Sequence, residues 1–247
     1  MPRVRTAGVQ RGPRPGGPRR DRPQTCGIPR NSAGGVRVAR VRNPPGESAP
    51  HAPRSTVTPR SAHTSAPVLD TLAERWSPRS FDGEHTFPEG ALRGVLEAAR
   101  WAPSANNSQP WRFIVARRGG ASFARIAQAL AGSNRQWAGR AAALIVNLAE
   151  VADADGAPRP WAEYDLGQAV AHLSVQAHSE GFSTHQMGGF DREAIRTAFD
   201  LDERLIPVSI TAIGMLGNPA QLPEPLRERE IAPRTRKALE DLVLARD

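Results

Sequence analysis

Apolar side chains recur at two spacings along residues 66–247, and these spacings separate predicted helices from predicted strands. Apolar positions three or four apart, the spacing of one helix face, predict helices over 67–76, 86–100, 121–130, 161–180 and 191–199, with a last short helix near 238–244. Short β-rich apolar runs predict strands over 111–116, 142–148, 182–187 and 205–216. This order of helices and strands predicts an α/β or α+β fold.

The ends of the predicted helices carry further signals. Thr86-Phe87-Pro88-Glu89 is a capping-box pattern with proline in the first turn, and Asp191 is placed to cap the helix that ends at Phe199. Gly181 is the expected end of the longest helix. The first two helices are expected to bury the apolar side chains Leu69, Leu72 and Ala73, and Leu92, Val95, Leu96 and Ala99.

Residues 1–65 differ in composition from the rest of the chain. They hold 13 Arg against Asp21 and Glu47, a net charge of +11, which leaves a net charge of −3 on residues 66–247. They also hold 11 of the 23 prolines and no aromatic residue. Such a segment cannot bury enough apolar surface to offset its ordering entropy, so disorder is predicted. We interpret it as a solvated tail or as sequence upstream of the native start; a basic arm and a transit peptide are the alternatives.

The composition disfavours several classes of function. The predicted folded part, 66–247, is acidic and has no recognisable nucleic-acid motif, so nucleic acid is not the expected partner. Cys26 is the only cysteine, which excludes a disulfide framework and a cysteine-based metal site. No run of about 18 apolar residues predicts a membrane span, and no apolar segment follows the twin arginine Arg19-Arg20. The cytoplasm is therefore the expected compartment, and any redox chemistry requires a bound cofactor.

Four polar segments interrupt the amphipathic pattern and are candidates for chemistry. Arg75–Phe81 offers two arginines and two hydroxyls to a phosphate. Ser104–Gln109 offers uncharged donors and acceptors suited to a heteroaromatic ring or a ribityl chain. Gly188-Gly189 allows close backbone approach to a flat ligand, and Arg234–Lys237 offers three cations to an anion. Each segment alone also fits an ordinary structural interpretation, as solvated arginines, a polar connection or a turn.

In this order, the segments resemble the nitroreductase family of flavin mononucleotide (FMN) enzymes. The most specific block is Glu97–Val115, which reads EAARWAPSANNSQPWRFIV. Asn134, within GSNRQW, resembles an asparagine that contacts the flavin. The resemblance covers about residues 68–244. The chain departs from the family at Trp76, where many members carry a second basic residue, and at Gly188, where some carry an acid.

The resemblance implies a mixed central sheet flanked by helices, formed by a domain over 66–247. It also implies an obligate homodimer with FMN at the interface and a C-terminal arm, from Pro219, that wraps the partner. The implied chemistry is hydride transfer from NADH or NADPH to FMN N5, and then to a nitroaromatic, a quinone or a related electron acceptor. The flavin carries this chemistry, so no catalytic side chain is expected, although His185 is a candidate neighbour of the ring.

By similarity, the two arginine segments hold the phosphate, and Arg79 also lies near flavin N1 and the C2 carbonyl. The Gly189 N–H is expected to point at N5, and the loop before Trp111 to come from the partner subunit. The cofactor-binding residues that the resemblance implies are Arg75, Trp76, Ser77, Arg79, Pro103, Ser104, Asn107, Gln109, Asn134, Gly188, Gly189, Arg234 and Arg236.

Two other hypotheses stay open at this point. The first is a flavin enzyme of the same fold that does not use NAD(P)H, such as a tailoring dehydrogenase or a dehalogenase. The second is an arginine-rich nucleic-acid-binding protein whose folded part is a scaffold. The physiological substrate, and the choice between NADH and NADPH, are not encoded in any motif of this chain.

Overall fold

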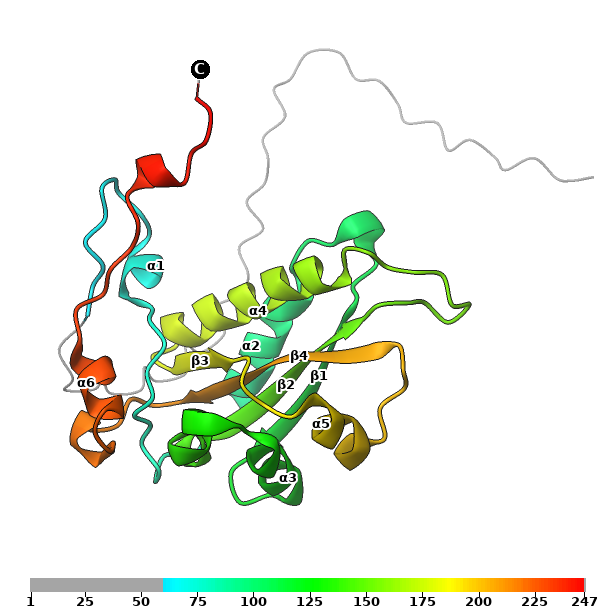
Figure 1. Cartoon of the computed structure of the whole chain (residues 1–247), viewed down its shortest axis with the longest axis horizontal. Helices are drawn as coiled ribbons and strands as arrows, with labels where there is room; N and C mark the ends of the chain where they lie inside the picture. The colour runs from blue at the N-terminus through cyan, green and yellow to red at the C-terminus, as the bar shows by residue number, and fades with distance from the viewer. Residues whose placement is uncertain (1–59, 247) are drawn as a thin grey trace, which may run out of the picture. The chain divides into compact units, whose positions relative to one another are not determined.

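A four-stranded sheet is the centre of the computed structural model, which describes residues 60–246 (Figure 1). Its strands are β1 (Trp111–Arg117), β2 (Ala143–Glu150), β3 (Ser183–Met187) and β4 (Leu205–Gly214). They pair in the order β1-β2-β4-β3, and each pair is antiparallel. The α+β class is confirmed. The pairing differs from the mixed sheet that the resemblance implies, since residues 60–246 contain no parallel pair.

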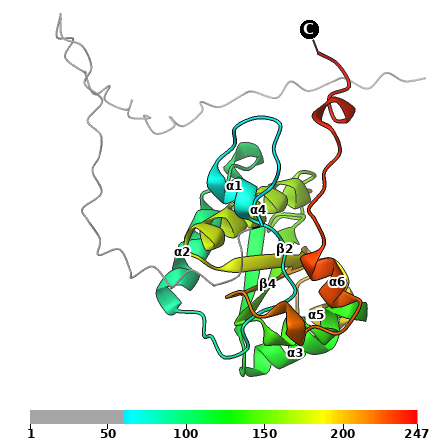
Figure 2. The same ribbon diagram turned by 90° about the vertical axis from the view of Figure 1, so that its left-hand side faces the viewer.

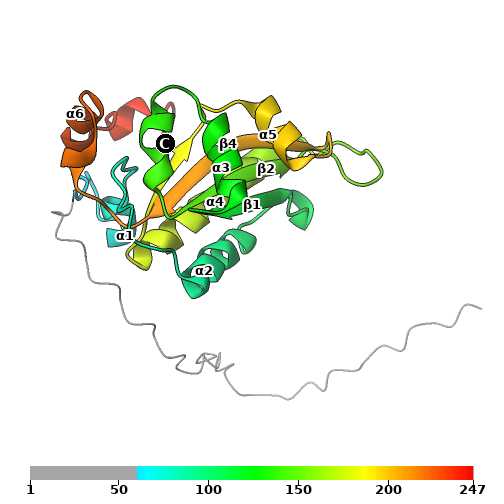
Figure 3. The ribbon, with the colours of Figure 1, turned by 90° about the horizontal axis from the view of Figure 1, so that it is seen from below.

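Helices cover both faces of the sheet. The helices α2 (Glu89–Arg100) and α4 (Ala162–Ser179) pack on one face, and α3 (Ala121–Ala129) and α5 (Arg192–Phe199) pack on the other (Figures 1 and 3). This arrangement explains the uninterrupted apolar run of β2, in which every residue except Glu150 is buried. A strand covered on both faces has no solvent-facing side for polar residues.

Two of the candidate segments, the glycine segment and the first arginine segment, adjoin β3 and the end of β4. Strand β3 runs directly into Gly188-Gly189, and the chain after β4 pairs with the first arginine segment through a bridge between Leu216 and Phe81. The short helix α1 (Asp70–Glu74) lies at this edge beside the C-terminal arm, which contains α6 (Leu226–Ile231) (Figure 2). Two 3₁₀ turns, at Pro219–Gln221 and Leu239–Asp241, complete the arm.

Most of the predicted elements are present, with local corrections. The predicted capping box is wrong: α2 begins after Pro88, which is its N-cap in extended conformation, and no side chain caps it. Asp191 does cap α5, since its Oδ1 accepts the Ala194 N–H at 3.0 Å. Helix α6 was not predicted, and the expected last helix is only a 3₁₀ turn.

The predicted apolar stripe of the first helix is not buried in this chain. Helix α1 has only five residues, none of them buried, and the side chains of Leu69 and Leu72 are 71% and 49% exposed. The stripe of α2 is buried at three of its four positions, Leu92, Val95 and Ala99. Of the residues 1–65 for which disorder is predicted, residues 1–59 lie outside the described residues. No helix among residues 60–246 is both long and apolar enough to cross a bilayer.

Candidate functional site

A cluster of guanidinium groups lies where α1 meets the C-terminal arm. The side chain of Arg234 donates to the backbone carbonyls of Arg60 and Ala73, each at 2.6 Å, and to that of Arg75 at 2.9 Å. Arg236 lies close enough that its charge lowers the pKa of Arg75, after a larger contribution from burial. The first and last predicted arginine segments are therefore brought together, although about 160 residues separate them in the chain.

The cluster has no acidic counterpart in the described part of the chain. No ion pair among residues 60–246 involves Arg60, Arg75, Arg234 or Arg236. Burial lowers the pKa of Arg234, and the charges of Arg75, Arg236 and Arg60 lower it further. A cavity of about 280 Å³ opens beside the cluster and is lined by Arg75, Arg234 and Arg236. Like charges held together beside an open cavity favour the binding of an anion.

A buried carboxylate fixes the backbone of the first arginine segment. Glu230, on α6, is 2% exposed, and its side chain accepts the N–H groups of Arg79, at 3.0 and 2.9 Å, and of Ser80, at 2.9 Å. The Ser80 hydroxyl in turn donates to the Asn218 carbonyl at 2.8 Å. The C-terminal arm thus sets the position of the segment that carries Arg75, Ser77 and Arg79. Glu230 lies in an ordinary charged run, so no sequence pattern singles it out.

The glycine segment and Asn134 contact each other. The Gly189 carbonyl accepts the Ala131 N–H at 3.0 Å and Nδ2 of Asn134 at 3.1 Å. A Cβ atom at position 189 would lie 3.0 Å from that same Nδ2, so a side chain there would press against the Asn134 amide. The Gly189 N–H donates to no group among residues 60–246, which leaves it available to a ligand.

His185 connects the arginine segment to the sheet. It lies on β3, its ring packs 4.6 Å from the ring of Trp137, and its Nδ1 lies 2.9 Å from the Pro78 carbonyl. A carbonyl only accepts, so Nδ1 carries the proton and Nε2 the lone pair. Burial lowers the pKa of His185 to about 4, against the hydrogen bond to Pro78, and Arg79 lowers it further. The imidazole is therefore neutral at pH 7.

We predict that His185 makes the apoprotein sensitive to acid. The unfolded chain takes up this proton near pH 6.5, whereas the folded chain takes it up only near pH 4, so stability is full above pH 6.5 and falls between these values. The expected loss is about 3 kcal/mol. Urea unfolding at pH 7 and pH 4 should show this loss in the wild type and in the exposed control His172→Gln, and only a smaller loss in His185→Gln. Equal losses in all three proteins would refute the assignment.

The loop before β1 contacts the start of α4, whereas α1 beside the arginine cluster contacts its end. It contains a 3₁₀ turn, Ala105–Asn107, and three residues with positive φ: Asn106, Asn107 and Gln109, at 52°, 55° and 47°. Asparagine tolerates this conformation, but glutamine rarely adopts it. The loop is held internally, because the Ser104 hydroxyl accepts the Gln109 N–H at 3.0 Å. Strained backbone of this kind collects at binding sites.

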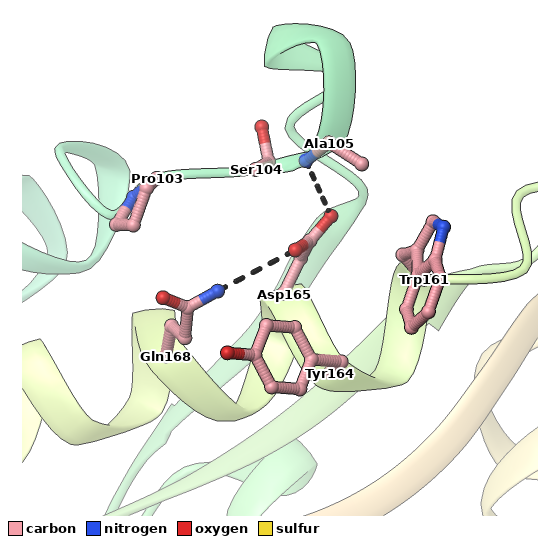
Figure 4. A pocket seen from close by; sticks show the side chains of 7 residues that line it. All are labelled: Pro103, Ser104, Ala105, Trp161, Tyr164, Asp165 and Gln168. Carbon is pink, nitrogen blue, oxygen red and sulfur yellow. Dashed lines mark hydrogen bonds between the residues drawn. The ribbon is translucent and has the colours of Figure 1, made fainter. Parts of the chain in front are cut away.

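A second buried carboxylate anchors this loop to α4. Asp165 is 3% exposed and accepts the Ala105 N–H at 3.0 Å, as Figure 4 shows. A cavity of about 250 Å³ lies at this junction, with Pro103 and Ser104 on one side and Trp161, Tyr164 and Gln168 on the other (Figure 4). The side chains of Trp161 and Tyr164 are 61% and 67% exposed. The loop therefore faces an open, partly aromatic surface.

Two groups of predicted site residues, in the arginine segments and in the loop, thus lie near opposite ends of α4. Asp165 near its start holds the loop, and His178 near its end lies 3.8 Å from Glu74 of α1. The thirteen residue steps from Asp165 to His178 span about 20 Å of helix. The first group, in the two arginine segments, comprises Arg75, Trp76, Ser77, Arg79, Arg234 and Arg236. The second, in the loop, comprises Pro103, Ser104, Asn107 and Gln109. Asn134, Gly188 and Gly189 lie together beyond the last residue of β3.

The comparison with protein families identifies the chain. The model of the nitroreductase family matches residues 72–145 and 131–215, which is more than half of the chain. The chain belongs to the nitroreductase family. The matched residues of this nitroreductase-family chain include the arginine segment, the loop and the glycine segment, and they end before α6. Among residues 60–246, no group of three His, Cys, Asp or Glu side chains is arranged to hold a metal ion.

Individual relatives agree with this assignment. A 15.4 kDa protein from the ask 5′ region of Mycolicibacterium smegmatis is 38% identical over 138 residues, which are 53% of this chain and 92% of the relative. A protein named NADH dehydrogenase, from Thermus thermophilus, is 28% identical over 190 residues, 63% of this chain and 89% of the relative. A crystal structure described as an oxidoreductase containing FMN superposes with a TM-score of 0.71 at 34% identity, covering 74% of this chain and 94% of that one.

Proposed function

We propose that this nitroreductase-family chain is an FMN-dependent oxidoreductase that takes hydride from NADH or NADPH and delivers it to an organic electron acceptor. The observation that carries the proposal is the uncompensated cluster of Arg75, Arg234 and Arg236 beside a cavity. The free Gly189 N–H follows strand β3, to which His185 joins the arginine segment. A phosphate dianion is the natural occupant of several converging guanidinium groups. A flavin ring is a natural neighbour of a glycine backbone that no side chain obstructs.

The described residues fit FMN in charge and in donor chemistry. The guanidinium groups of the cluster carry the positive charge that the phosphate requires, and the Ser77 hydroxyl lies within the same segment. The loop at Ser104–Gln109 supplies uncharged donors and acceptors for the ribityl chain and the ring edge. Similarity to a crystal structure containing FMN supports the same assignment.

When bound, FMN supplies hydride acceptance and donation at N5, in two alternating half-reactions with a nitroaromatic, a quinone or a related acceptor. The chain itself binds and orients the cofactor. Arg234 ties α1 to the arm, Glu230 sets the backbone of Arg79, and Asn134 holds the carbonyl of Gly189 so that its N–H stays exposed. A cation at Arg79 near the pyrimidine edge favours the reduced flavin, on which negative charge accumulates.

The split of the site into two groups supports a homodimer. One chain keeps its loop about 20 Å from its own arginine cluster along α4, so a ligand that contacts both groups requires a second chain. Exposed apolar side chains beside the loop and on the arm, including Trp161, Tyr164 and Leu242, provide surface for that contact. Twofold symmetry would create two equivalent sites, each with the cluster of one chain and the loop of the other.

Mixed dimers test this arrangement directly. Arg234→Met damages the cluster, and Ser104→Leu removes the hydroxyl that accepts the Gln109 N–H. Each variant alone should retain little FMN. Mixed dimers, isolated through two different affinity tags after co-expression, should hold about half the FMN of the wild type, because one of their two sites combines an intact cluster with an intact loop. Mixed dimers as empty as the single variants would contradict the shared site.

The visible spectrum of the purified full-length chain tests the proposed function itself. We expect a flavin absorption band that bleaches when NADH or NADPH is added without oxygen and returns when a quinone or a nitroaromatic follows. A band that neither nucleotide bleaches would favour a same-fold flavin enzyme that does not use NAD(P)H. A chain that stays colourless after addition of FMN would overturn the proposal.

A further inference from the structure

Arg60 lies outside the family-matched residues, which begin at residue 72, yet its side chain contacts the candidate site. Its guanidinium carbon lies 4.4 Å from the centre of the Trp76 ring, and its Nη1 donates to the backbone carbonyl of Glu230. Its own carbonyl accepts a hydrogen bond from Nη1 of Arg234 at 2.6 Å. Arg60 therefore joins the stretch before α1 both to the arginine segment and to the arm.

We propose that Arg60 is a further anion-binding residue of the phosphate site, contributed from outside the family-matched part of the chain and positioned by Trp76. This inference rests on the proposed FMN site. Trp76 brings no charge of its own to the segment between Arg75 and Arg79; its ring instead holds a charge from another part of the chain.

The contacts of Arg60 suit this role. Stacking on an indole ring and one bond to a carbonyl fix the plane of the guanidinium, so little conformational entropy remains to be lost when an anion binds. The hydrogen bond to Glu230 uses only one of the five N–H donors of arginine. The charge of Arg60 lowers the pKa of Arg234, which shows that the two guanidinium groups are near enough to raise the electrostatic potential together.

The neighbouring backbone closes around the same cavity. The Ala62 N–H donates to the Ala73 carbonyl at 2.8 Å, the carbonyl that also accepts from Arg234. Ala62, His63 and Thr64 line the 280 Å³ cavity together with Arg236. The stretch that starts at Arg60 thus forms one wall of the cavity, and Arg60 is its anchor.

The experiment compares two flavins that differ only in the phosphate. Dissociation constants for FMN and riboflavin are measured by quenching of flavin fluorescence, on the full-length wild type, Arg60→Gln and Arg60→Lys, with Arg93→Gln on the exposed face of α2 as the matched control. Arg60→Gln should weaken FMN binding about tenfold and change riboflavin binding less than about twofold. Arg60→Lys, which keeps the charge, should recover most of the loss, and Arg93→Gln should match the wild type.

Three results would overturn the inference or its basis. Arg60→Gln that binds FMN as tightly as the wild type would show that the cation is not part of the site. Equal weakening of FMN and riboflavin would show a structural effect without a role toward the phosphate. A wild type that binds neither flavin would instead remove the proposed function on which the inference rests.

Discussion

Replacing Arg234 with methionine should weaken FMN binding by about 100-fold or more, the largest loss we expect from a single change in the cluster. The side chain donates to the carbonyls of Arg60, Ala73 and Arg75, so it holds three parts of the site together as well as supplying charge. Hydrogen bonds from a charged donor are worth about 1.5–3 kcal/mol each when a partner is removed. Methionine keeps an unbranched apolar chain like the stem of arginine and loses every donor.

Arg229→Met on α6 is the matched control. The Arg229 side chain is exposed and makes no side-chain hydrogen bond within residues 60–246. The substitution therefore removes the same charge from the C-terminal arm without removing a contact of the cluster. FMN titration of the two variants should differ by about two orders of magnitude at low salt, and the difference should shrink as salt rises. If the two variants bind FMN equally, Arg234 does not hold the phosphate.

The individual helices and strands could be predicted because each depends on a pattern of residues close together in the sequence. The apolar run of β2, the amphipathic stripe of α4 and the capping aspartate of α5 each report on neighbours within a few residues. The capping box predicted at Thr86 is wrong because of Pro88, the same proline that supported the prediction. Pro88 fixes its own φ and serves as the N-cap itself, so α2 begins too late for Thr86 to reach its N–H groups.

The contacts that assemble the site could not be predicted from such patterns. Each of two site segments is held by a buried carboxylate far away in the sequence: Glu230 holds the backbone at Arg79 and Ser80, and Asp165 holds the backbone at Ala105. Neither carboxylate stands in a distinctive motif. Their roles depend on which N–H groups the fold leaves unpaired, and that is a property of three-dimensional packing.

The position of the loop could not be predicted from the sequence either. Sequence order places Ser104–Gln109 between the arginine segment and the glycine segment, but the fold moves the loop to the far end of α4. The separation could not be read from spacing, because it depends on the direction in which the chain crosses the sheet. It gives physical support to the prediction that the partner subunit supplies the loop.

Glu230→Gln should lower the free energy of unfolding by about 2–3 kcal/mol and the melting temperature by about 5–10 °C. The change keeps the size of the side chain but replaces one acceptor oxygen with an NH₂ group. That group would face the N–H of Arg79 or of Ser80, so one buried donor loses its partner. FMN should bind more weakly as well, because the arginine segment is no longer held by the arm.

The exposed Glu228→Gln, on the same helix, removes the same charge without disturbing a buried contact, and it should melt within about 1 °C of the wild type. Thermal unfolding of the apoproteins, followed by FMN titration, separates the two effects. If Glu230→Gln is more stable than the wild type, the desolvation of this carboxylate costs more free energy than its three contacts with N–H groups contribute. Glu230 would then be kept for the geometry of the arginine segment, and only the FMN titration would reveal its loss.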